Sequence, residues 1–347
     1  MEKEEPKMTV CKFASLWKAL HKCTRNVGWK DSVASYANHS LVGAYKIKCS
    51  LDEGAYRLSP YAVFYIHEPK ERRITSTKFK DRVVQRSLCD NYLYDAICAD
   101  FVEENCACQK KKGTDYARKT LVREMKSFHK ENGLDGWILK CDIKDFFGST
   151  SHEMAKKAVS DRAKDPWAVG MVNDIIDSFG DMGIGLGSQV SQLIQLAVLD
   201  GLDHFVKEEL GIKHYVRYMD DFILIDKSKR KLELCLNAIR SRVVGIGLRL
   251  SEKKTRIQKV SQPIRFLGFS FMLWDTSKVT WRLPDENLRN ERRRLKCLVR
   301  RASMGALTKA DVDECYQSWR AHAKKSDSRG KILKMDKYYK NLWRTTL

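Results

Sequence analysis

Two adjacent carboxylates, Asp220 and Asp221, lie in the stretch HYVRYMDDFILI between two runs of apolar and aromatic residues. Asp is a common turn residue, so a solvated hairpin tip is one interpretation. A second acidic segment favours a different interpretation. In KCDIKDFFGS, Asp142 lies between a cysteine and an isoleucine, an apolar setting for a charge. An unpaired buried carboxylate is very costly, so Asp142 is expected to have a cation partner.

Three carboxylates on neighbouring strands would repel one another unless a divalent metal neutralised them. Asp142, Asp220 and Asp221 therefore predict a metal site. The set suits two Mg²⁺ ions about 3.5–4 Å apart, with Mn²⁺ as a substitute, which activate an attacking oxygen and stabilise a leaving one. Phosphoryl transfer depends on such charge stabilisation more than on an acid or a base. Asp145 is expected farther along the same strand on the opposite face, and is interpreted as structural.

Strands and helices must alternate to position these acids. YAVFYIHEPKERRITST predicts two strands around a charged bend, and helical spacing begins at KFKDRVVQ. WILKCDIKDFFGS predicts a strand, and Ser151 is a plausible N-cap for the helix after it. A glycine-rich loop, GDMGIGLGSQ, opens another helix, and RFLGFSFMLW with KVTWRL predicts a closing hairpin. After Pro284 the pattern is helical and basic, so an α+β fold with a separate helical unit is expected.

The charge of the chain indicates a polyanionic partner. Lys plus Arg number 65 against 44 Asp plus Glu among 347 residues, a net charge of +21, and 43% of residues are hydrophobic. The chain is therefore expected to fold and to bind nucleic acid in preference to a membrane. Residues 289–347 carry 17 Lys or Arg and only 6 Asp or Glu.

The cysteines and the N-terminus bear on the compartment. Eleven cysteines without a repeating spacing, and an N-terminus without an apolar signal segment, favour the reducing cytoplasm. Cys106 and Cys108 lack a second pair at zinc-finger spacing, which weighs against a zinc site there. No apolar run approaches the ~20 residues of a membrane span.

Four motifs stand in the order of reverse transcriptase motifs: KFKDRVVQ, DIKDFF, YMDD after an apolar strand, and FLGF. The chain resembles a compact bacterial reverse transcriptase, most closely over residues 60–272. The resemblance implies a right hand of three parts: an N-terminal segment and fingers with part of the palm (1–136), a palm with the catalytic motifs (137–283) and a basic helical thumb (284–347).

The resemblance also assigns roles to the acids. It implies that Asp142, Asp220 and Asp221 form the metal-binding triad, with the backbone carbonyl of Ile143 as a further metal ligand. The implied partners are a template RNA, the primer–cDNA duplex and deoxynucleoside triphosphates. The thumb would lie along the duplex and contact its phosphates without reading sequence.

Phe147 lies five residues after Asp142, where this family places an aromatic steric gate. A ring packed beneath the sugar leaves no room for a 2′-hydroxyl, so deoxynucleotides would be favoured. An ordinary core phenylalanine is the alternative, and Phe146 is interpreted as one.

Basic residues near the fingers bend match those that the family directs at the triphosphate. Lys70 and Arg72, in EPKERRI, would offset the charge that develops on the leaving pyrophosphate, and Arg73 could replace Arg72. Arg82, in KDRVVQ, is a candidate for triphosphate or template contact. A solvated charged turn remains the alternative.

Two further motifs lie downstream of YMDD. Lys254, in LSEKKTRI, matches a palm lysine that the family keeps near the nucleotide, where it could act as a general acid. An ordinary surface lysine is the alternative. FLGF resembles the primer-grip hairpin, where glycine lets the backbone approach the primer closely. Its residues are Phe266, Leu267, Gly268 and Phe269.

LGSQVSQ distinguishes between subgroups. Retroviral, group II intron and retron enzymes usually show Gln-Gly, three residues, then Ser-Pro. Here Leu186 stands at the glutamine position before Gly187, and Gln192 replaces proline after Ser191. This pattern resembles the error-prone reverse transcriptases of diversity-generating retroelements, which misincorporate opposite adenine and work with a small basic accessory protein. Leucine cannot hydrogen-bond the nucleotide as glutamine can, although Leu186 could equally pack only the loop.

Other functions stay open. An antiphage-defence or retron-type enzyme is the runner-up, but the chain has neither the Asn-Ala-x-x-His nor the Val-Thr-Gly segment typical of retrons. Protein-primed or template-independent synthesis is a further alternative. A catalytically inactive nucleic-acid-binding scaffold is disfavoured because the three aspartates, Lys254 and Phe147 are all present.

Overall fold

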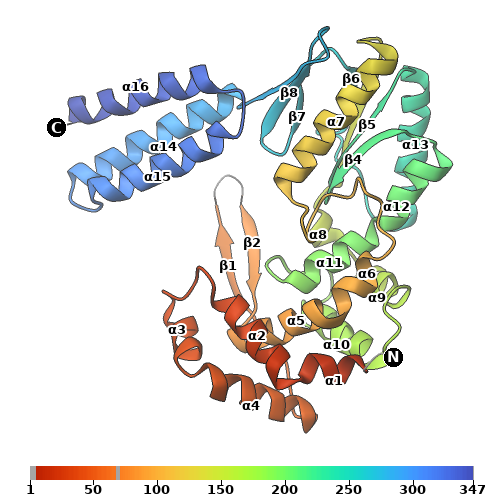
Figure 1. Cartoon of the computed structure of the whole chain (residues 1–347), viewed down its shortest axis with the longest axis vertical. Coiled ribbons are helices and arrows are strands. Elements are labelled where there is room, and N and C mark those ends of the chain that lie inside the picture. Colours follow the sequence, from red (N-terminus) through yellow and green to blue (C-terminus); the bar gives the residue numbers. More distant parts are fainter. Residues whose placement is uncertain (1–4, 68–70, 347) are drawn as a thin grey trace.

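The computed structural model describes residues 5–67 and 71–346 (Figure 1). Four short helices open the chain: α1 (Pro6–Cys11), α2 (Phe13–Thr24), α3 (Asp31–Asn38) and α4 (Ser40–Asp52). Their apolar residues, such as Leu16 and Ile47, form a core with Phe79 and Val83 of the next helix. That packing supplies stability that helices of this length lack in isolation.

An antiparallel hairpin follows, formed by β1 (Ala62–Ile66) and β2 (Arg72–Ser76). All five residues of β1 are exposed. The hairpin has the position that the sequence predicted. Lys70, expected at its bend, lies outside the described residues.

A four-stranded antiparallel sheet of order β4-β5-β3-β6 forms the centre of the molecule. Its strands are β3 (Trp137–Asp142), β4 (His214–Tyr218), β5 (Asp221–Asp226) and β6 (Arg256–Lys259). In β5, Phe222 and Leu224 enter one apolar core, and Ile223 and Ile225 enter another on the opposite face. This alternation is the consequence of the two-residue period of a strand, and it explains why β5 is apolar throughout.

Helices cover both faces of this sheet. α7 (Thr114–Asn132) packs against β4 and β5, and α13 (Lys229–Gly245) packs against β3 and β5. The remaining helices of this region are α5 (Phe79–Leu88), η1 (Cys89–Leu93), α6 (Tyr94–Cys98), α8 (Phe146–Ser149), α9 (His152–Ser160), α10 (Pro166–Asp177), α11 (Gln189–Val198), α12 (Asp200–His204) and η2 (Phe205–Glu209). The Ser151 hydroxyl accepts a hydrogen bond from the Met154 amide at 3.2 Å, as expected of an N-cap.

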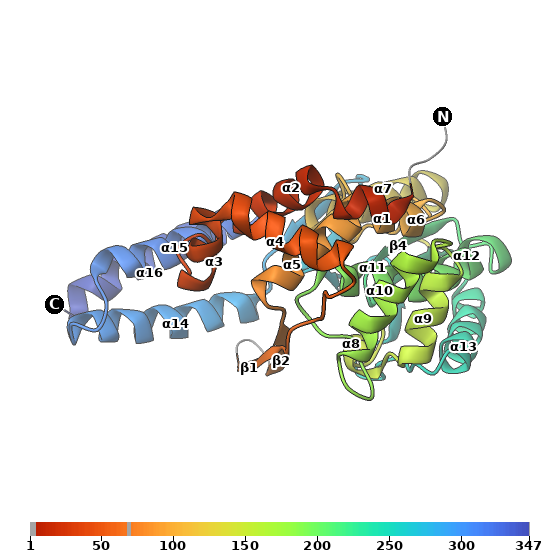
Figure 2. The same cartoon turned by 90° about the horizontal axis from the view of Figure 1, so that it is seen from below.

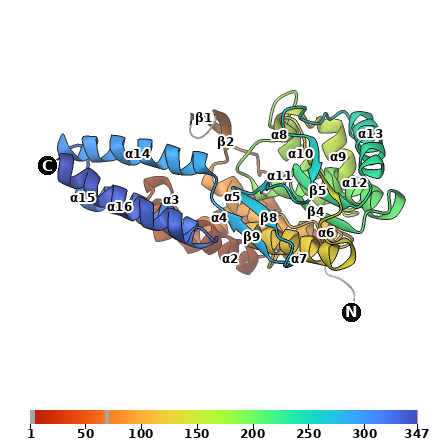
Figure 3. The same cartoon turned by 90° about the horizontal axis from the view of Figure 1, so that it is seen from above.

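A second, three-stranded sheet leads to the C-terminal helices. Its strands are β7 (Ile264–Phe266), β8 (Phe269–Leu273) and β9 (Val279–Arg282). Three helices follow: α14 (Asp285–Ser303), α15 (Lys309–Lys324) and α16 (Arg329–Thr346). They project from one side of the molecule, and α14 lies on the same side as the β1–β2 hairpin and α8 (Figures 2 and 3). The mixed architecture confirms the α+β class.

The structure corrects one premise about Asp145. The strand β3 ends at Asp142, and Asp145 has a left-handed backbone (φ 46°) directly before α8. The two-residue alternation of a strand therefore does not fix the direction of its side chain. Within the described parts of the chain, no helix combines the length and apolar character needed to cross a membrane.

Candidate functional site

The antiparallel register of β3 and β5 brings the predicted carboxylates to one edge of the central sheet. Asp142 is the last residue of β3 and is paired with Asp221, the first residue of β5. Asp220 lies in the turn that joins β4 to β5. Its carbonyl accepts a hydrogen bond from the Ile143 amide at 3.0 Å, which ties this turn to the end of β3. Three acids from two separate motifs thus meet at one place.

The surroundings of these acids disfavour their negative charge. Burial and the neighbouring charge of Asp142 raise the pKa of Asp220, while Lys254 and Arg72 act in the opposite direction. Burial raises the pKa of Asp221 to about 6, against the effect of Lys140. Like charges in a desolvated site have this effect unless cations compensate them.

Two lysines provide the compensating charge. The Lys254 ammonium donates to both carboxylate oxygens of Asp142, at 2.7 and 2.6 Å. The Lys140 ammonium donates to Oδ2 of Asp221 at 2.9 Å, while Oδ1 of Asp221 is buried and has no hydrogen-bond partner. Asp142 therefore has the cation partner that its apolar setting required.

The carboxylate oxygens of Asp142, Asp220 and Asp221 fit a divalent cation, although Lys140 and Lys254 now donate hydrogen bonds to some of these oxygens. Among residues 5–67 and 71–346, no three His, Cys, Asp or Glu side chains are close enough together to hold a metal ion as they stand. The free Oδ1 of Asp221, the raised pKa of Asp220 and Asp221, and an all-oxygen donor set are nevertheless the features of a site for a hard cation.

A cavity of about 340 Å³ collects several of the predicted nucleotide-binding residues. Arg72, Arg73, Phe147 and Leu186 all line it, together with Asp145. Asp142, Asp220 and Asp221 are not among the described residues that line the cavity, but Asp145, three residues after Asp142, is, and the charge of Arg72 lowers the pKa of Asp220. The hairpin, the segment that follows β3 and the glycine-rich loop therefore line one cavity.

Three other predicted nucleotide-binding residues do not line this cavity. The Arg82 guanidinium donates at 3.3 Å to the carbonyl of Thr77, the residue that directly follows β2. Gln192 lies one turn into α11, and Gly187, with φ 113°, has the Thr75 carbonyl 3.5 Å from the position of an added Cβ. Among the residues that the structure describes, none of these three lines the cavity.

The FLGF segment forms the tight turn between β7 and β8. Leu267 and Gly268 both have left-handed backbones, with φ of 44° and 85°. The Leu267 carbonyl accepts from Arg118 at 3.3 Å, and the Phe269 ring stacks on His322 of α15 with centroids 4.9 Å apart. Burial lowers the pKa of His322, as do the nearby charges of Arg118 and Lys325. This turn therefore contacts both α7 and the C-terminal helix α15.

Lys140 is a site residue that was not predicted from the sequence. This lysine also donates to the Arg265 carbonyl at 2.7 Å, so it links Asp221 to β7. The signal was present in the sequence, because Lys140 precedes Asp142 by two residues and therefore shares its strand face. Arg217 was also missed, although an arginine in the apolar strand before YMDD requires a buried partner.

Comparison with known proteins agrees with this geometry. The family model described as Reverse transcriptase (RNA-dependent DNA polymerase) matches residues 67–271, more than half of the chain. Protein YkfC of Escherichia coli (strain K12) is 22% identical over 294 residues, which cover 70% of this chain and 76% of that protein.

A solved structure also resembles the chain. The apo telomerase from Candida tropicalis matches with a TM-score of 0.48 and 12% sequence identity, over 62% of this chain. The match spans about half of the telomerase chain, 47%. The family match covers β2, the central sheet and the FLGF turn, which belong to a right-hand polymerase fold. The chain therefore belongs to the reverse transcriptase family, and it is an RNA-directed DNA polymerase.

Proposed function

We propose that Asp142, Asp220 and Asp221 hold two divalent metal ions, most suitably Mg²⁺, beside the 3′ end of a DNA primer, with the Ile143 carbonyl as a further ligand. The observation that carries this proposal is the pairing of Asp142 with Asp221 at the sheet edge, next to a cavity lined by cationic and aromatic residues. When bound, such ions activate the primer hydroxyl and neutralise the charge on the reacting phosphates.

The surrounding residues bind and orient the nucleotide in this proposal. Arg72 and Arg73 attract the triphosphate into the cavity, and Phe147 limits the space beside the sugar. The Lys254 ammonium, held at Asp142, is placed to give a proton to the leaving pyrophosphate. Lys70 and Arg82 are secondary candidates for phosphate contact from the hairpin side.

The FLGF turn and the C-terminal helices would hold the nucleic acid. Leu267 and Gly268 form the tip of the turn that we assign as the primer grip, between Phe266 and Phe269. The basic helix α14 then lies where it can follow the phosphates of a template–primer duplex. These contacts read charge and shape, not sequence.

Primer extension tests the assigned site. With purified protein, Mg²⁺, a primed RNA template and deoxynucleotides, we expect wild-type extension, and loss of at least ~10³-fold in Asp220→Ala because charge stabilisation supplies most of the catalysis. Asp275→Ala, which changes an exposed aspartate in the β8–β9 turn, is the matched control and should extend normally. Extension by Asp220→Ala at the wild-type rate would refute the assignment of the triad.

We further propose that the enzyme belongs to the error-prone group of diversity-generating retroelements, copying a template RNA with the help of a small basic accessory protein. Leu186 supports this proposal because it lines the cavity, and its aliphatic side chain offers no hydrogen bond to a nucleotide or a template base. Gly187 and Gln192 complete the sequence pattern.

The error spectrum tests this subgroup. Leu186→Gln should lower misincorporation opposite template adenine, because an added amide can restrain the geometry of the base pair. Leu234→Gln, which makes the same change at an exposed residue of α13 that does not line the cavity, is the control and should leave the spectrum as in the wild type. An unchanged spectrum in Leu186→Gln would contradict the proposed role.

A further inference from the structure

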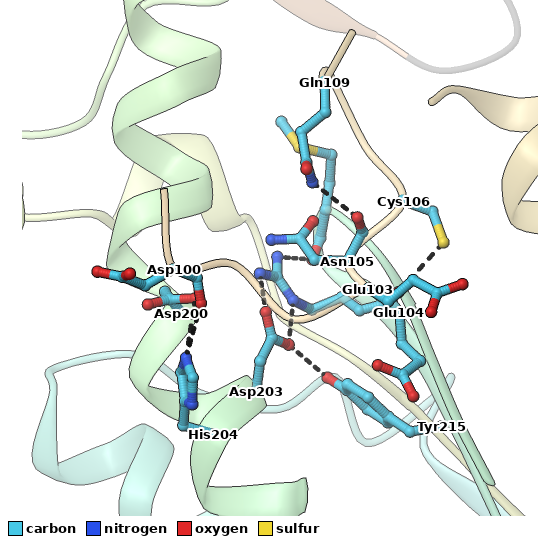
Figure 4. A network of polar contacts seen from close by, with 12 residues as sticks. Asp100, Glu103, Glu104, Asn105, Cys106, Gln109, Asp200, Asp203, His204 and Tyr215 are labelled. Carbon is cyan, nitrogen blue, oxygen red and sulfur yellow. Dashed lines mark hydrogen bonds and ion pairs between the residues drawn. The ribbon is translucent and has the colours of Figure 1, made fainter. Parts of the chain in front are cut away.

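Arg217 carries a charge in the middle of β4 and is completely buried. Its guanidinium forms a two-pronged ion pair with Asp203 of α12, with Nε 2.6 Å from Oδ1 and Nη2 bonded to Oδ2. Asp203 is also completely buried and accepts a third hydrogen bond from the Tyr215 hydroxyl at 2.7 Å (Figure 4). The pair is thus completely buried, and both carboxylate oxygens of Asp203 accept hydrogen bonds.

The remaining arm of the guanidinium reaches the turn that carries the catalytic aspartate. Nη1 of Arg217 donates to the carbonyl of Met219 at 3.0 Å. Met219 has a left-handed backbone, φ 56°, which is unfavourable for a residue with a side chain. Surrounding contacts must impose such a conformation, and this hydrogen bond is one that does so.

Contacts from two sides fix the turn. The Arg217 guanidinium donates to the Met219 carbonyl. The Ile143 amide, directly after β3, donates to the next carbonyl, that of Asp220, at 3.0 Å. The backbone of Arg217 is itself bonded to the segment around Asn105: its amide donates to Glu104 at 3.0 Å, and its carbonyl accepts from Cys106 at 2.9 Å. These backbone hydrogen bonds fix the position of Arg217, and its guanidinium can therefore restrain the turn between β4 and β5.

We propose that the Arg217–Asp203 pair is a positioning device for Asp220: the pair holds Met219 in its left-handed conformation and so aims the carboxylate that follows at the metal site. This inference rests on the catalytic role of Asp220 proposed above. Arg217 acts through the backbone and touches neither metal nor substrate.

A role in stability alone would not require this arrangement. A buried ion pair can often be replaced by apolar residues of similar size without loss of stability, because the desolvation of both charges is then avoided. Pairing with Asp203 uses only Nε and Nη2 of the guanidinium. The third contact, to a strained carbonyl directly before Asp220, is what a positioning role requires.

The test replaces the pair by apolar residues and compares it with a neighbouring pair. Asp203→Leu/Arg217→Met removes both charges together. Asp200→Leu/Arg162→Met is the matched control, because Asp200 lies one turn earlier in the same helix, is equally buried and is paired with an arginine that does not contact the turn. Primer extension gives kcat and KM for the nucleotide, and binding of Mn²⁺ without nucleic acid gives a measurement independent of activity.

If the pair aims Asp220, the Asp203→Leu/Arg217→Met variant should lose about 100-fold in kcat, since a misplacement of about 1 Å costs of this order. Its Mn²⁺ affinity should fall, while duplex affinity stays unchanged, and the Asp200→Leu/Arg162→Met variant should match the wild type in all three. A folded Asp203→Leu/Arg217→Met variant with the kcat and Mn²⁺ affinity of the control would overturn the proposal.

Arg217→Lys provides a second, milder variant should the double variant fail to fold. Lysine keeps a charge opposite Asp203 but lacks the planar fork that reaches two carboxylate oxygens and a carbonyl at once. Reduced kcat with unchanged duplex affinity supports the inference, and wild-type kcat overturns it. Asp220→Ala, measured alongside, separates the two proposals: if it remains active, the assigned triad fails, whereas if only the Arg217 variants remain active, the positioning role fails.

Discussion

Phe146 and Phe147 are adjacent rings with different surroundings. Phe146 is buried in the main core, and Phe147 faces the cavity shared by Arg72 and Leu186. Their ring centroids are 5.9 Å apart at an interplanar angle of 70°, an edge-to-face contact. In the proposed nucleotide cavity, a ring at the wall can contact the sugar, whereas a ring in the core cannot.

Phe147→Ala should therefore relax the choice of sugar. Removing the ring leaves space for a 2′-hydroxyl, and the ratio of kcat/KM for deoxynucleotides over ribonucleotides should fall by about 100-fold, the order expected for a steric contact of this size. Single-nucleotide extension with each nucleotide type measures the ratio.

Phe146→Leu is the matched control for that change. It alters the neighbouring core ring and should lower the free energy of unfolding by about 1 kcal/mol, without changing the sugar ratio. If Phe147→Ala discriminated between the sugars as the wild type does, the steric role of Phe147 would be wrong.

Residues of the site differ in how far the sequence reveals them. Asp142, Asp220 and Asp221 stand out because an acid inside an apolar run is rare and needs an explanation. Lys140 follows from the two-residue period of a strand. The pairing of Arg217 with Asp203 cannot be predicted in this way, because Asp203 reaches Arg217 only through the packing of α12 against β4.

At the scale of elements, the loop between α10 and α11 forms one wall of the proposed nucleotide cavity. Gly183 and Gly185 both line it, and a Cβ on Gly185 would lie 2.3 Å from the Phe179 ring. That ring stacks on Tyr61 with centroids 5.0 Å apart, and the Tyr61 hydroxyl is 2.7 Å from the Ser178 hydroxyl. The glycine thus permits the loop to pack closely against the segment that leads to β1.

Gly185→Ala should displace this wall. The methyl group must move the Phe179 ring, so we expect KM for the deoxynucleotide to rise about tenfold, as small misplacements of a binding site do. The affinity for the template–primer duplex should not change. Steady-state extension and duplex titration measure the two quantities.

Gly170→Ala is the control, because Gly170 lies inside α10 with no atom within 4 Å of an added Cβ. It should raise the free energy of unfolding by about 0.5–1 kcal/mol, since alanine is the better helix residue, and leave KM unchanged. An equal rise of KM in both variants would contradict the role of the loop.

Elements with a clear period were predictable, and those set by local backbone geometry were not. The β1–β2 hairpin, the strands around YMDD and the helix capped by Ser151 all follow from apolar spacing and turn chemistry. The end of β3 at Asp142 does not follow from any such pattern. The left-handed backbone of Asp145 lies directly before α8, and no pattern of side chains specifies it.

At the scale of the whole molecule, charge is concentrated on the C-terminal helices. α14 is basic along most of its length, and Glu291, Leu295 and Val299 form its buried face. Arg293 and Arg301 are exposed. Because α14 lies on the side of the β1–β2 hairpin and α8, this helix is available to a duplex that leaves the proposed catalytic site (Figures 2 and 3). α16 lies on the opposite side.

This asymmetry predicts a specific salt dependence. Each phosphate contact releases counterions, so the logarithm of duplex affinity should fall linearly with the logarithm of salt concentration, and loss of one contact should reduce the slope by about 1. Arg293→Gln/Arg301→Gln should therefore reduce the slope by about 2. Lys334→Gln/Lys337→Gln removes the same charge from exposed residues of α16 and should change the slope little, because α16 lies on the side of the helical unit away from the β1–β2 hairpin and α8 (Figure 3). Fluorescence anisotropy with a labelled RNA–DNA duplex over a KCl series measures both slopes. Equal changes in the two variants would mean that net charge, and not the placement of α14, governs binding.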